Sequence, residues 1–219
     1  YNGYSDRLII KKQVILMTEK EKMIAGLLYD CTDDELMKLR TKAHILCKDY
    51  NDTYETDTNE RKEIIKQLLP NSSQNIYLQG PIQFDYGVFT SFGENCYANF
   101  NFIVLDCCPV NVGNNVLFGP NCTLATPIHP IHFEERRIVT APDGRSLEYE
   151  YAKPIEIGND CWLASNVTVC GGVKIGSGTI IGAGSVVTKD IPENCFAAGN
   201  PCRVIRKITE KDKLKYKNI

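Results

Sequence analysis

The hydrophobic pattern in the second half of the chain repeats every six residues. An aliphatic residue recurs at Ile157, Leu163, Val169, Ile175, Ile181 and Val187, and a second apolar or small residue follows each one four positions later. An α-helix buries positions about 3.6 residues apart and a strand buries alternate positions, so neither produces a strict period of six. The pattern predicts a triangular coil of short parallel strands, in which stacked coils share one continuous core.

The six-residue pattern extends toward the N-terminus, with one long interruption. Irregular hexads begin near Ile82, a good register holds from Val112 to Ala125, and regular hexads resume at Pro154. No hexad fits residues 126–153, which contain three prolines and several charged residues. We therefore predict a β-helix over residues 71–196 with an extruded loop at 126–153, and such loops on rigid scaffolds often carry function.

The first third of the chain has a helical pattern instead. Two apolar stripes carry it, the first made of Met23, Ile24, Leu27 and Leu28, the second of Leu36, Leu39, Ala43 and Leu46. Thr32 and Glu35 have the spacing of a capping box that would open the second helix. These helices are too short to form a domain alone, so we expect residues 17–70 to cap the open end of the β-helix.

The two ends of the chain receive simpler interpretations. Residues 1–16 precede Met17 and are interpreted as an upstream extension. Residues 197–219 form a C-terminal segment that ends in a polar, lysine-rich tail, for which we expect a short helix.

Composition narrows the possible partners. Lys and Arg number 25 against 27 Asp and Glu, without the basic block that nucleic-acid binders carry. No apolar run approaches the roughly 18 residues that a membrane crossing needs. The ten cysteines lack C-x-x-C spacing, and no secretory segment is visible. We expect free thiols in a reducing cytoplasm.

Histidines are the first candidates for chemistry. His44 lies in the helical segment, whereas His129 and His132 lie where the predicted loop leaves the coils. With an ordinary pKa near 6.5, a histidine at that place can act as a general base. A loop histidine that only binds backbone groups is the alternative, and spacing alone leaves both open.

Several motifs carry a resemblance to a known family. They are residues 25–30 (AGLLYD), 97–101 (YANFN), 129–130 (HP), 154–162 (PIEIGNDCW), 182–192 (GAGSVVTKDIP) and 198–203 (AGNPCR). Together they resemble the galactoside/maltose O-acetyltransferases of the hexapeptide acyltransferases. The resemblance implies a mainly β fold, a left-handed parallel β-helix with an N-terminal helical cap, and a cytoplasmic homotrimer with active sites between subunits.

The resemblance also assigns roles to individual residues. His129 would take the proton from a sugar hydroxyl that attacks acetyl-CoA directly, without an acyl-enzyme. The backbone N–H of Ser165 would stabilise the tetrahedral oxyanion. The implied acceptor contacts are Asp30, Asp85, Asn99, Asp106 and Glu150, with Cys31 and Cys107 as alternatives to Asp30 and Asp106. By the same resemblance, Glu150 would contact the acceptor or orient the histidine.

Coenzyme A needs a groove, an apolar contact and cations for its phosphates. The residues that the resemblance assigns to it are Trp162, Ala183, Thr188, Lys189, Arg203 and Arg206. The last two supply guanidinium groups, which suit phosphate. The resemblance implies no metal.

Three other functions remain as alternatives. The first is acetyl transfer to a different hydroxyl, such as that of serine, a lipo-oligosaccharide sugar or an antibiotic. The second is a zinc enzyme with three histidine ligands, which the coil region disfavours because it holds only His129 and His132. The third is a non-catalytic β-helix scaffold, which would need neither His129 nor Arg203.

Overall fold

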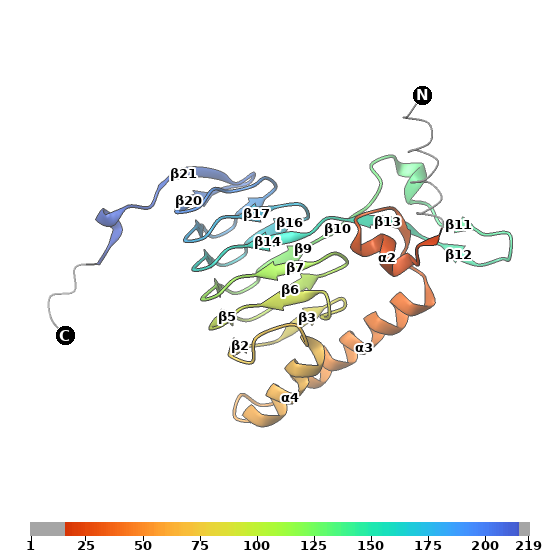
Figure 1. Cartoon of the computed structure of the whole chain (residues 1–219), viewed down its shortest axis with the longest axis horizontal. Helices are drawn as coiled ribbons and strands as arrows, with labels where there is room; N and C mark the ends of the chain where they lie inside the picture. The colour runs from red at the N-terminus through yellow and green to blue at the C-terminus, as the bar shows by residue number, and fades with distance from the viewer. Residues whose placement is uncertain (1–15, 215–219) are drawn as a thin grey trace.

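A computed structural model describes residues 16–214, which form a parallel β-helix closed at one end by helices (Figure 1). The fold class predicted from the hexads is confirmed. The upstream extension predicted at residues 1–16 lies outside the described residues, except for Leu16.

The coils have three faces, each a sheet of parallel strands. The seven-stranded face contains β2 (Ile76–Leu78), β5 (Cys96–Ala98), β8 (Leu117–Phe118), β15 (Trp162–Leu163), β18 (Ile180–Ile181), β20 (Cys195–Ala198) and the antiparallel β21 (Arg203–Lys207). The five-stranded face contains β3 (Ile82–Phe84), β6 (Phe102–Leu105), β9 (Thr123–Ala125), β16 (Thr168–Cys170) and β19 (Val186–Val187). The four-stranded face contains β4 (Thr90–Phe92), β7 (Val110–Val112), β14 (Ile155–Ile157) and β17 (Lys174–Ile175).

The residues that define the hexads form the core. All six aliphatic residues that recur between 157 and 187 are at most 3 % exposed. They stack on one another through the parallel ladders, so that Leu163 lies beside Ile181 and Val169 beside Val187. Each side chain therefore packs on its copy one coil away, as the period of six predicts.

Two ladders of asparagine side chains run along two corners of the triangular coil. One joins Asn95, Asn115 and Asp160, and the other joins Asn101, Asn121 and Asn166. All six residues have φ between 57° and 60°. Asparagine and aspartate tolerate this left-handed conformation better than most side chains. Each ladder therefore fixes the turn of one coil to the turn of the next.

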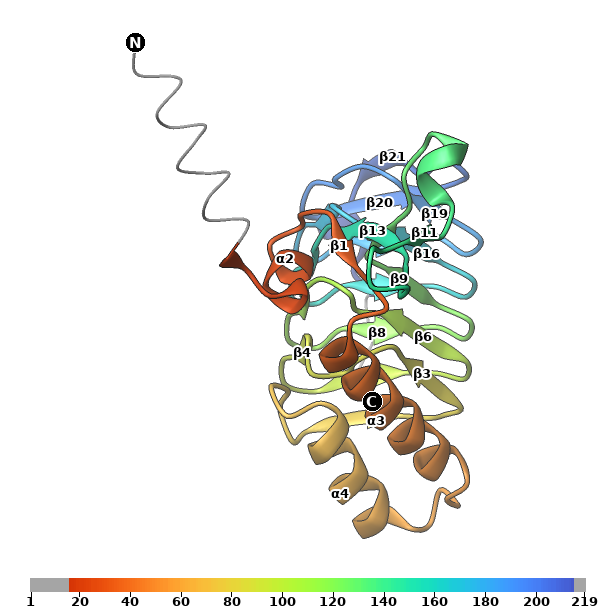
Figure 2. The ribbon, with the colours of Figure 1, turned by 90° about the vertical axis from the view of Figure 1, so that its right-hand side faces the viewer.

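The helical cap covers the first coil. It consists of α2 (Glu19–Ile24), α3 (Asp34–Asn51) and α4 (Thr58–Leu68), and α3 and α4 lie at the β2 and β3 end (Figures 1 and 2). The Asn51 side chain donates to the Ile82 carbonyl at 2.9 Å and accepts from its N–H at 2.8 Å. Arg61 donates to the Leu78 carbonyl at 2.8 Å. The cap thereby satisfies backbone groups that the edge of the first coil leaves open.

The first helix is shorter than its predicted stripe. It ends at Ile24, and Gly26 then turns the chain with φ of 71° toward β1 (Tyr29–Asp30). Only Met23 of the stripe is buried, whereas Ile24 and Leu28 are exposed. The expected stripe is wrong because the helix stops before its second turn of apolar residues.

The expected capping box at Thr32 is also wrong. Asp33 caps α3, because its carboxylate accepts from the backbone N–H groups of Glu35 and Leu36. A capping box exists instead at the start of α2, between Thr18 and Glu21. The Thr32 hydroxyl donates to the Asp30 carboxylate, and no N–H of the described helix α3 donates to it.

The extruded loop carries a small sheet of its own. Its elements are β10 (Pro127–Ile128), the 3-10 helix η1 (Phe133–Arg136), β11 (Val139–Thr140), β12 (Ser146–Leu147) and β13 (Tyr149–Ala152). Strand β13 pairs antiparallel with β10 on one side and with β1 on the other. The N-terminal segment thus adds a strand to the loop, beside the coils (Figure 2).

The C-terminal segment is mainly strand. Strand β21 pairs with β20 and ends the seven-stranded face, and the expected short helix is a single 3-10 turn, η2 (Glu210–Asp212). All ten cysteines are free thiols. Among the helices of residues 16–214, none has both the length and the apolar character that a membrane crossing requires.

The same substitution, Ile→Ala, should have very different effects on the free energy of unfolding at a buried and at an exposed position. Ile181→Ala should lower the free energy of unfolding by about 2–5 kcal/mol, because it leaves a cavity between stacked coils. Ile45→Ala, on the exposed side of α3, should change it by less than about 0.5 kcal/mol. Urea denaturation followed by circular dichroism measures both, and equal losses would contradict this account of the core.

Candidate active site

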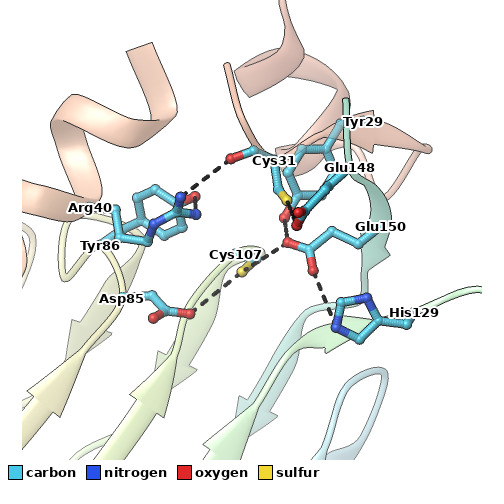
Figure 3. Close-up of polar contacts among 9 residues, drawn as sticks. All are labelled: Tyr29, Cys31, Arg40, Asp85, Tyr86, Cys107, His129, Glu148 and Glu150. Atoms are coloured by element: carbon cyan, nitrogen blue, oxygen red, sulfur yellow. Dashed lines mark hydrogen bonds and ion pairs between the residues drawn. The ribbon is translucent and has the colours of Figure 1, made fainter. Parts of the chain in front are cut away.

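A cluster of polar side chains lies where the loop sheet meets the end of the five-stranded face (Figure 3). His129 directly follows β10, Glu150 lies on β13, and Tyr29 lies on β1. Asp85 follows β3 and Cys107 follows β6, one coil apart. Residues from the cap, the coils and the loop therefore meet at one place.

Glu150 is at the centre of this cluster. Its side chain is 10 % exposed, and its Oε2 lies 3.7 Å from Nε2 of His129, whose side chain is 65 % exposed. Its Oε1 accepts a hydrogen bond from the Tyr29 hydroxyl, and the Cys107 thiol lies 4.0 Å from the same oxygen. The buried Glu150 carboxylate thus faces the exposed His129 imidazole. An imidazole in this position can accept a proton from a bound molecule.

Asp85 forms the second acidic point of the cluster. Its carboxylate lies 3.7 Å from Nε2 of His44 and 3.8 Å from the Cys107 thiol. Burial raises the pKa of Asp85, and the nearby His44 and Arg40 oppose that rise. Arg40 reaches the Tyr86 hydroxyl and the Cys31 carbonyl, both at 3.4 Å.

Several residues in and around this cluster were not among the predicted site residues. Tyr29, Arg40 and His44 lie on β1 and α3, far in sequence from the coils and the loop. Tyr29 is part of the AGLLYD motif and was within reach of sequence reasoning. Nothing in the helical pattern distinguishes Arg40 or His44 from other polar residues of α3.

Two of the predicted acceptor contacts are engaged inside the protein. Asp30 is 6 % exposed, and its Oδ1 accepts from both the N–H and the hydroxyl of Thr32 and from the N–H of Glu148. Asp106 is fully buried, and its two oxygens accept from the Tyr86 N–H and the Thr90 hydroxyl. Burial raises the pKa of Asp106. Asp106 therefore has both oxygens engaged inside the protein, and Asp30 has its Oδ1 engaged.

Cys31 and Cys107, which directly follow Asp30 and Asp106 in the sequence, lie closer to the cluster. Cys31 is half-buried, with its thiol 4.0 Å from Glu148, and Cys107 lies between Asp85 and Glu150. Burial, with Glu150 nearby, raises the pKa of Cys31 to about 11. Burial followed by Glu150 and Asp85 raises the pKa of Cys107 as well. Since the thiolate is the nucleophilic form, both thiols are poor nucleophiles at neutral pH.

Asn99, Ser165 and Ala183 lie elsewhere on the molecule. Each follows a strand of the seven-stranded face, so they share the corner that leads into the five-stranded face. His129 follows the opposite edge of the five-stranded face. The strands between the two edges have two to four residues, and four extended residues span about 13 Å. One chain therefore does not bring Asn99 or Ser165 to His129.

Ser165 presents an available backbone donor. Its carbonyl accepts from Gly184 at 2.9 Å, while no backbone carbonyl within residues 16–214 accepts from its N–H. Gly119 lies directly against it, because a Cβ at that position would be 2.6 Å from the Ser165 nitrogen. A side chain at 119 would therefore displace this donor.

The remaining predicted residues lie on the outside of the coils. Ala183, Thr188, Lys189 and Arg203 are exposed. Arg206 is exposed too, but its guanidinium binds both oxygens of Asp212, at 2.9 and 2.7 Å. Trp162 is 48 % exposed on the outer side of β15.

Trp162 belongs to a row of apolar side chains on the seven-stranded face, here called the outer ladder. Its members are Tyr77, Tyr97, Leu117, Trp162, Ile180 and Phe196, which are neighbours in the strand register. The Tyr77 and Tyr97 rings stack with 5.9 Å between centroids. None of the six is fully buried.

Comparison with known proteins identifies the family. The chain matches the model of the maltose acetyltransferase hexapeptide capping motif over residues 22–72 and the bacterial transferase hexapeptide model over residues 154–189. It is 39 % identical to galactoside O-acetyltransferase of Escherichia coli K12, over 91 % of this chain and 94 % of the relative. The chain belongs to the galactoside/maltose O-acetyltransferase family.

Solved structures agree with this assignment. A maltose O-acetyltransferase from Clostridium difficile 630 superposes with a TM-score of 0.80 at 42 % identity, covering 89 % of this chain and 99 % of its own. A galactoside acetyltransferase in complex with coenzyme A gives 0.82 at 39 % identity, covering 91 % and 96 %. This family member is an acetyl-CoA-dependent O-acetyltransferase. Among residues 16–214, no group of three or more His, Cys, Asp or Glu side chains is arranged to hold a metal ion.

The raised thiol pKa leads to a chemical prediction. Alkylation of Cys31 by iodoacetamide should be slow at pH 7.5 and should accelerate about tenfold per pH unit up to pH 10, because the rate follows the thiolate fraction. An ordinary thiol levels off above about pH 8.5. Mass spectrometry of timed samples measures the rate, with a peptide of the same local sequence as control. A rate for Cys31 that levels off below pH 9 would contradict the buried, acidic environment described for it.

Proposed function

We propose that this enzyme transfers the acetyl group of acetyl-CoA to a hydroxyl of a sugar acceptor resembling maltose, glucose or a galactoside, with His129 as general base. The observation that carries the proposal is the exposed His129 imidazole facing the buried Glu150 carboxylate beside the coils. The family membership supplies the reaction class.

The reaction needs one proton acceptor and no covalent enzyme intermediate. The acceptor oxygen attacks the thioester carbonyl while His129 takes its proton, and the imidazolium then protonates the departing coenzyme A thiolate. Glu150 stabilises the imidazolium between these two steps. Direct attack agrees with the raised pKa of Cys31 and Cys107, which keeps the two nearby thiols protonated.

The acceptor binds among the carboxylates of the cluster. Asp85 and Glu150 accept hydrogen bonds from sugar hydroxyls, and Asn99 contributes an amide whose Oδ1 already accepts from Phe100 at 2.7 Å. Because Oδ1 of Asp30 and both oxygens of Asp106 are engaged inside the protein, the acceptor meets Cys31 and Cys107 at these two positions. Thiols are weaker hydrogen-bond partners than carboxylates, so this part of the site binds sugar hydroxyls less strongly.

Coenzyme A lies along the corner that contains Ser165. The free Ser165 N–H stabilises the oxyanion, and Trp162 and Ala183 contact the pantetheine arm. Thr188, Lys189, Arg203 and Arg206 bind the phosphates. Arg206 must share or release Asp212 to do so, because that carboxylate occupies its guanidinium.

The active site forms between subunits of a cytoplasmic homotrimer. Asn99 and Ser165 lie at one edge of the five-stranded face and His129 at the other, so a second copy must bring them together. The outer ladder gives each copy an apolar surface that a neighbour can cover. Ten free cysteines suit a reducing compartment.

Replacing the base tests the mechanism. His129→Ala should lower kcat/KM by roughly 10²–10⁴-fold, since it removes general-base catalysis. The matched control is His132→Ala, in the same loop and exposed, which should keep activity within about twofold. Thiol release from acetyl-CoA is measured with maltose, glucose, galactosides, serine and chloramphenicol.

The acceptor panel separates the possible outcomes. Release that requires serine or chloramphenicol rather than a sugar would replace the proposed acceptor class. Sugar-dependent release at an undiminished rate in His129→Ala would exclude the histidine mechanism. No release with any acceptor, together with no binding of coenzyme A, would favour a scaffold.

Mixed trimers test the shared site. His129→Ala and Asn99→Ala should each be nearly inactive alone, and a refolded equal mixture should regain about a quarter of wild-type activity, because about one site in four combines both intact sides. Each variant refolded alone is the control. A mixture that contains mixed trimers by native mass spectrometry but stays inactive would show that one chain supplies both residues.

A further inference from the structure

Three neighbouring strands place Tyr29, Glu150 and His129 in one row. Tyr29 on β1 lies directly opposite Glu150 on β13. On the other side of β13, Ile128 pairs with Tyr151, so one further step on both strands brings His129 opposite Glu150. Side chains of residues directly opposite each other lie on the same face of a sheet. The register itself therefore lines up a phenol, a carboxylate and an imidazole (Figure 3).

The contacts along this row run in one direction. The fully buried Tyr29 donates its hydroxyl hydrogen bond to Oε1 of Glu150, and Oε2 of the same carboxylate faces Nε2 of His129 at 3.7 Å. The other group near Oε1 is the Cys107 thiol at 4.0 Å, which is a weak donor. Tyr29 is thus the strong donor that fixes how the carboxylate is turned.

We propose that Tyr29 is a positioning residue for the reaction, which holds the Glu150 carboxylate toward His129 through this row. The inference rests on the proposed role of His129 as general base. A carboxylate held beside the imidazole stabilises the imidazolium and limits the ring's orientations, as the buried aspartate does in serine-protease triads. Tyr29 contacts no reacting atom and acts only through Glu150.

The surroundings favour this role over others for the tyrosine. Burial, followed by the nearby Cys107 and Glu150, raises the pKa of Tyr29, so its hydroxyl stays protonated and remains a donor. Other titratable and charged groups surround the row: Asp85, Tyr86 and Cys107 from the coils, Cys31 beside β1, Glu148 beside β13, and Arg40 and His44 from α3. Tyr29 donates the strong hydrogen bond to Glu150, and the Cys107 thiol donates only a weak one.

The first test compares Tyr29→Phe with Glu150→Gln. Losing the carboxylate in Glu150→Gln should lower kcat, because nothing then stabilises the imidazolium. Tyr29→Phe should lower kcat roughly tenfold with the acceptor KM within about twofold, because a carboxylate without its donor turns away from the ring. In the Glu150→Gln background, Tyr29→Phe should change kcat little further, because Tyr29 acts only through Glu150. Thiol release from acetyl-CoA with a sugar acceptor measures kcat and KM for all three variants.

A matched control excludes a general effect of removing a buried hydroxyl. Tyr50 is also buried, and its hydroxyl donates to the Leu78 carbonyl at the far end of the cap. Tyr50→Phe should destabilise the protein without lowering kcat. An unchanged kcat in Tyr29→Phe would overturn the inference, as would a full additional loss of kcat when Tyr29→Phe is placed in the Glu150→Gln background.

A measurement that needs no Tyr29 variant remains if Tyr29→Phe does not fold. The Tyr29 hydroxyl proton should exchange slowly with water, and its NMR shift should change in Glu150→Gln, because its acceptor is then altered. A hydroxyl signal that is the same in Glu150→Gln would overturn the inference. Failure of the base proposal is distinguishable, because His129→Ala would then remain active, whereas failure of this inference alone leaves His129→Ala inactive and Tyr29→Phe like wild type.

Discussion

The structure depends on the six-residue register that joins every coil to its neighbours. The backbone of β15 binds β8 on one side and β18 on the other, and the inward Leu163 packs on Phe118 and Ile181. No coil has a complete set of hydrogen bonds or a closed core alone. The register therefore fixes the positions of the turns, and with them the places where functional groups can leave the coils.

Functional groups gather where this register is interrupted. The chain leaves the five-stranded face after β9, folds the loop sheet, and returns at β14. The interruption lets β13 pair with β1 from the cap, and it is at this junction that the carboxylates, thiols and histidines meet. The coils hold Asp85 and Cys107 in place, and the loop and the cap bring Glu150, His129 and Tyr29 to them.

Features that depend on a regular local pattern were predictable from the sequence, whereas features that depend on contacts between distant residues were not. The hexads were predictable because burial at a fixed period leaves a direct trace in the sequence, and all six inward residues are buried. The length of the first helix was not predictable, because the chain turns at Gly26, which has a positive φ, and the spacing of apolar residues gives no sign of that turn. The motifs assigned acceptor contacts to Asp30 and Asp106, but one residue decides whether a side chain faces the cluster or the interior of the protein.

The same limit applies to the site itself. The hydrogen bonds of Asp30 to Glu148 and of Asp106 to Tyr86 join residues 118 and 20 positions apart. No local pattern shows that these carboxylates are already engaged. Similarly, the free N–H of Ser165 depends on how closely Gly119 packs against it from the next coil. Such details follow from three-dimensional packing and not from motif or composition.

The pairing of β1 with β13 has a consequence for the order in which a competent enzyme can appear. The hydrogen bond between Tyr29 and Glu150 spans 121 residues, far more than the neighbouring-coil contacts. Contacts between distant segments close a large loop and carry its entropic cost, so they tend to form late. A chain can therefore have all its coils formed while β1 is not yet paired with β13. In such a chain the Glu150 carboxylate lies near His129 but lacks its hydrogen bond from Tyr29. Maturation of activity would then lag behind formation of the β-helix, and the docking of a two-residue strand would set that lag.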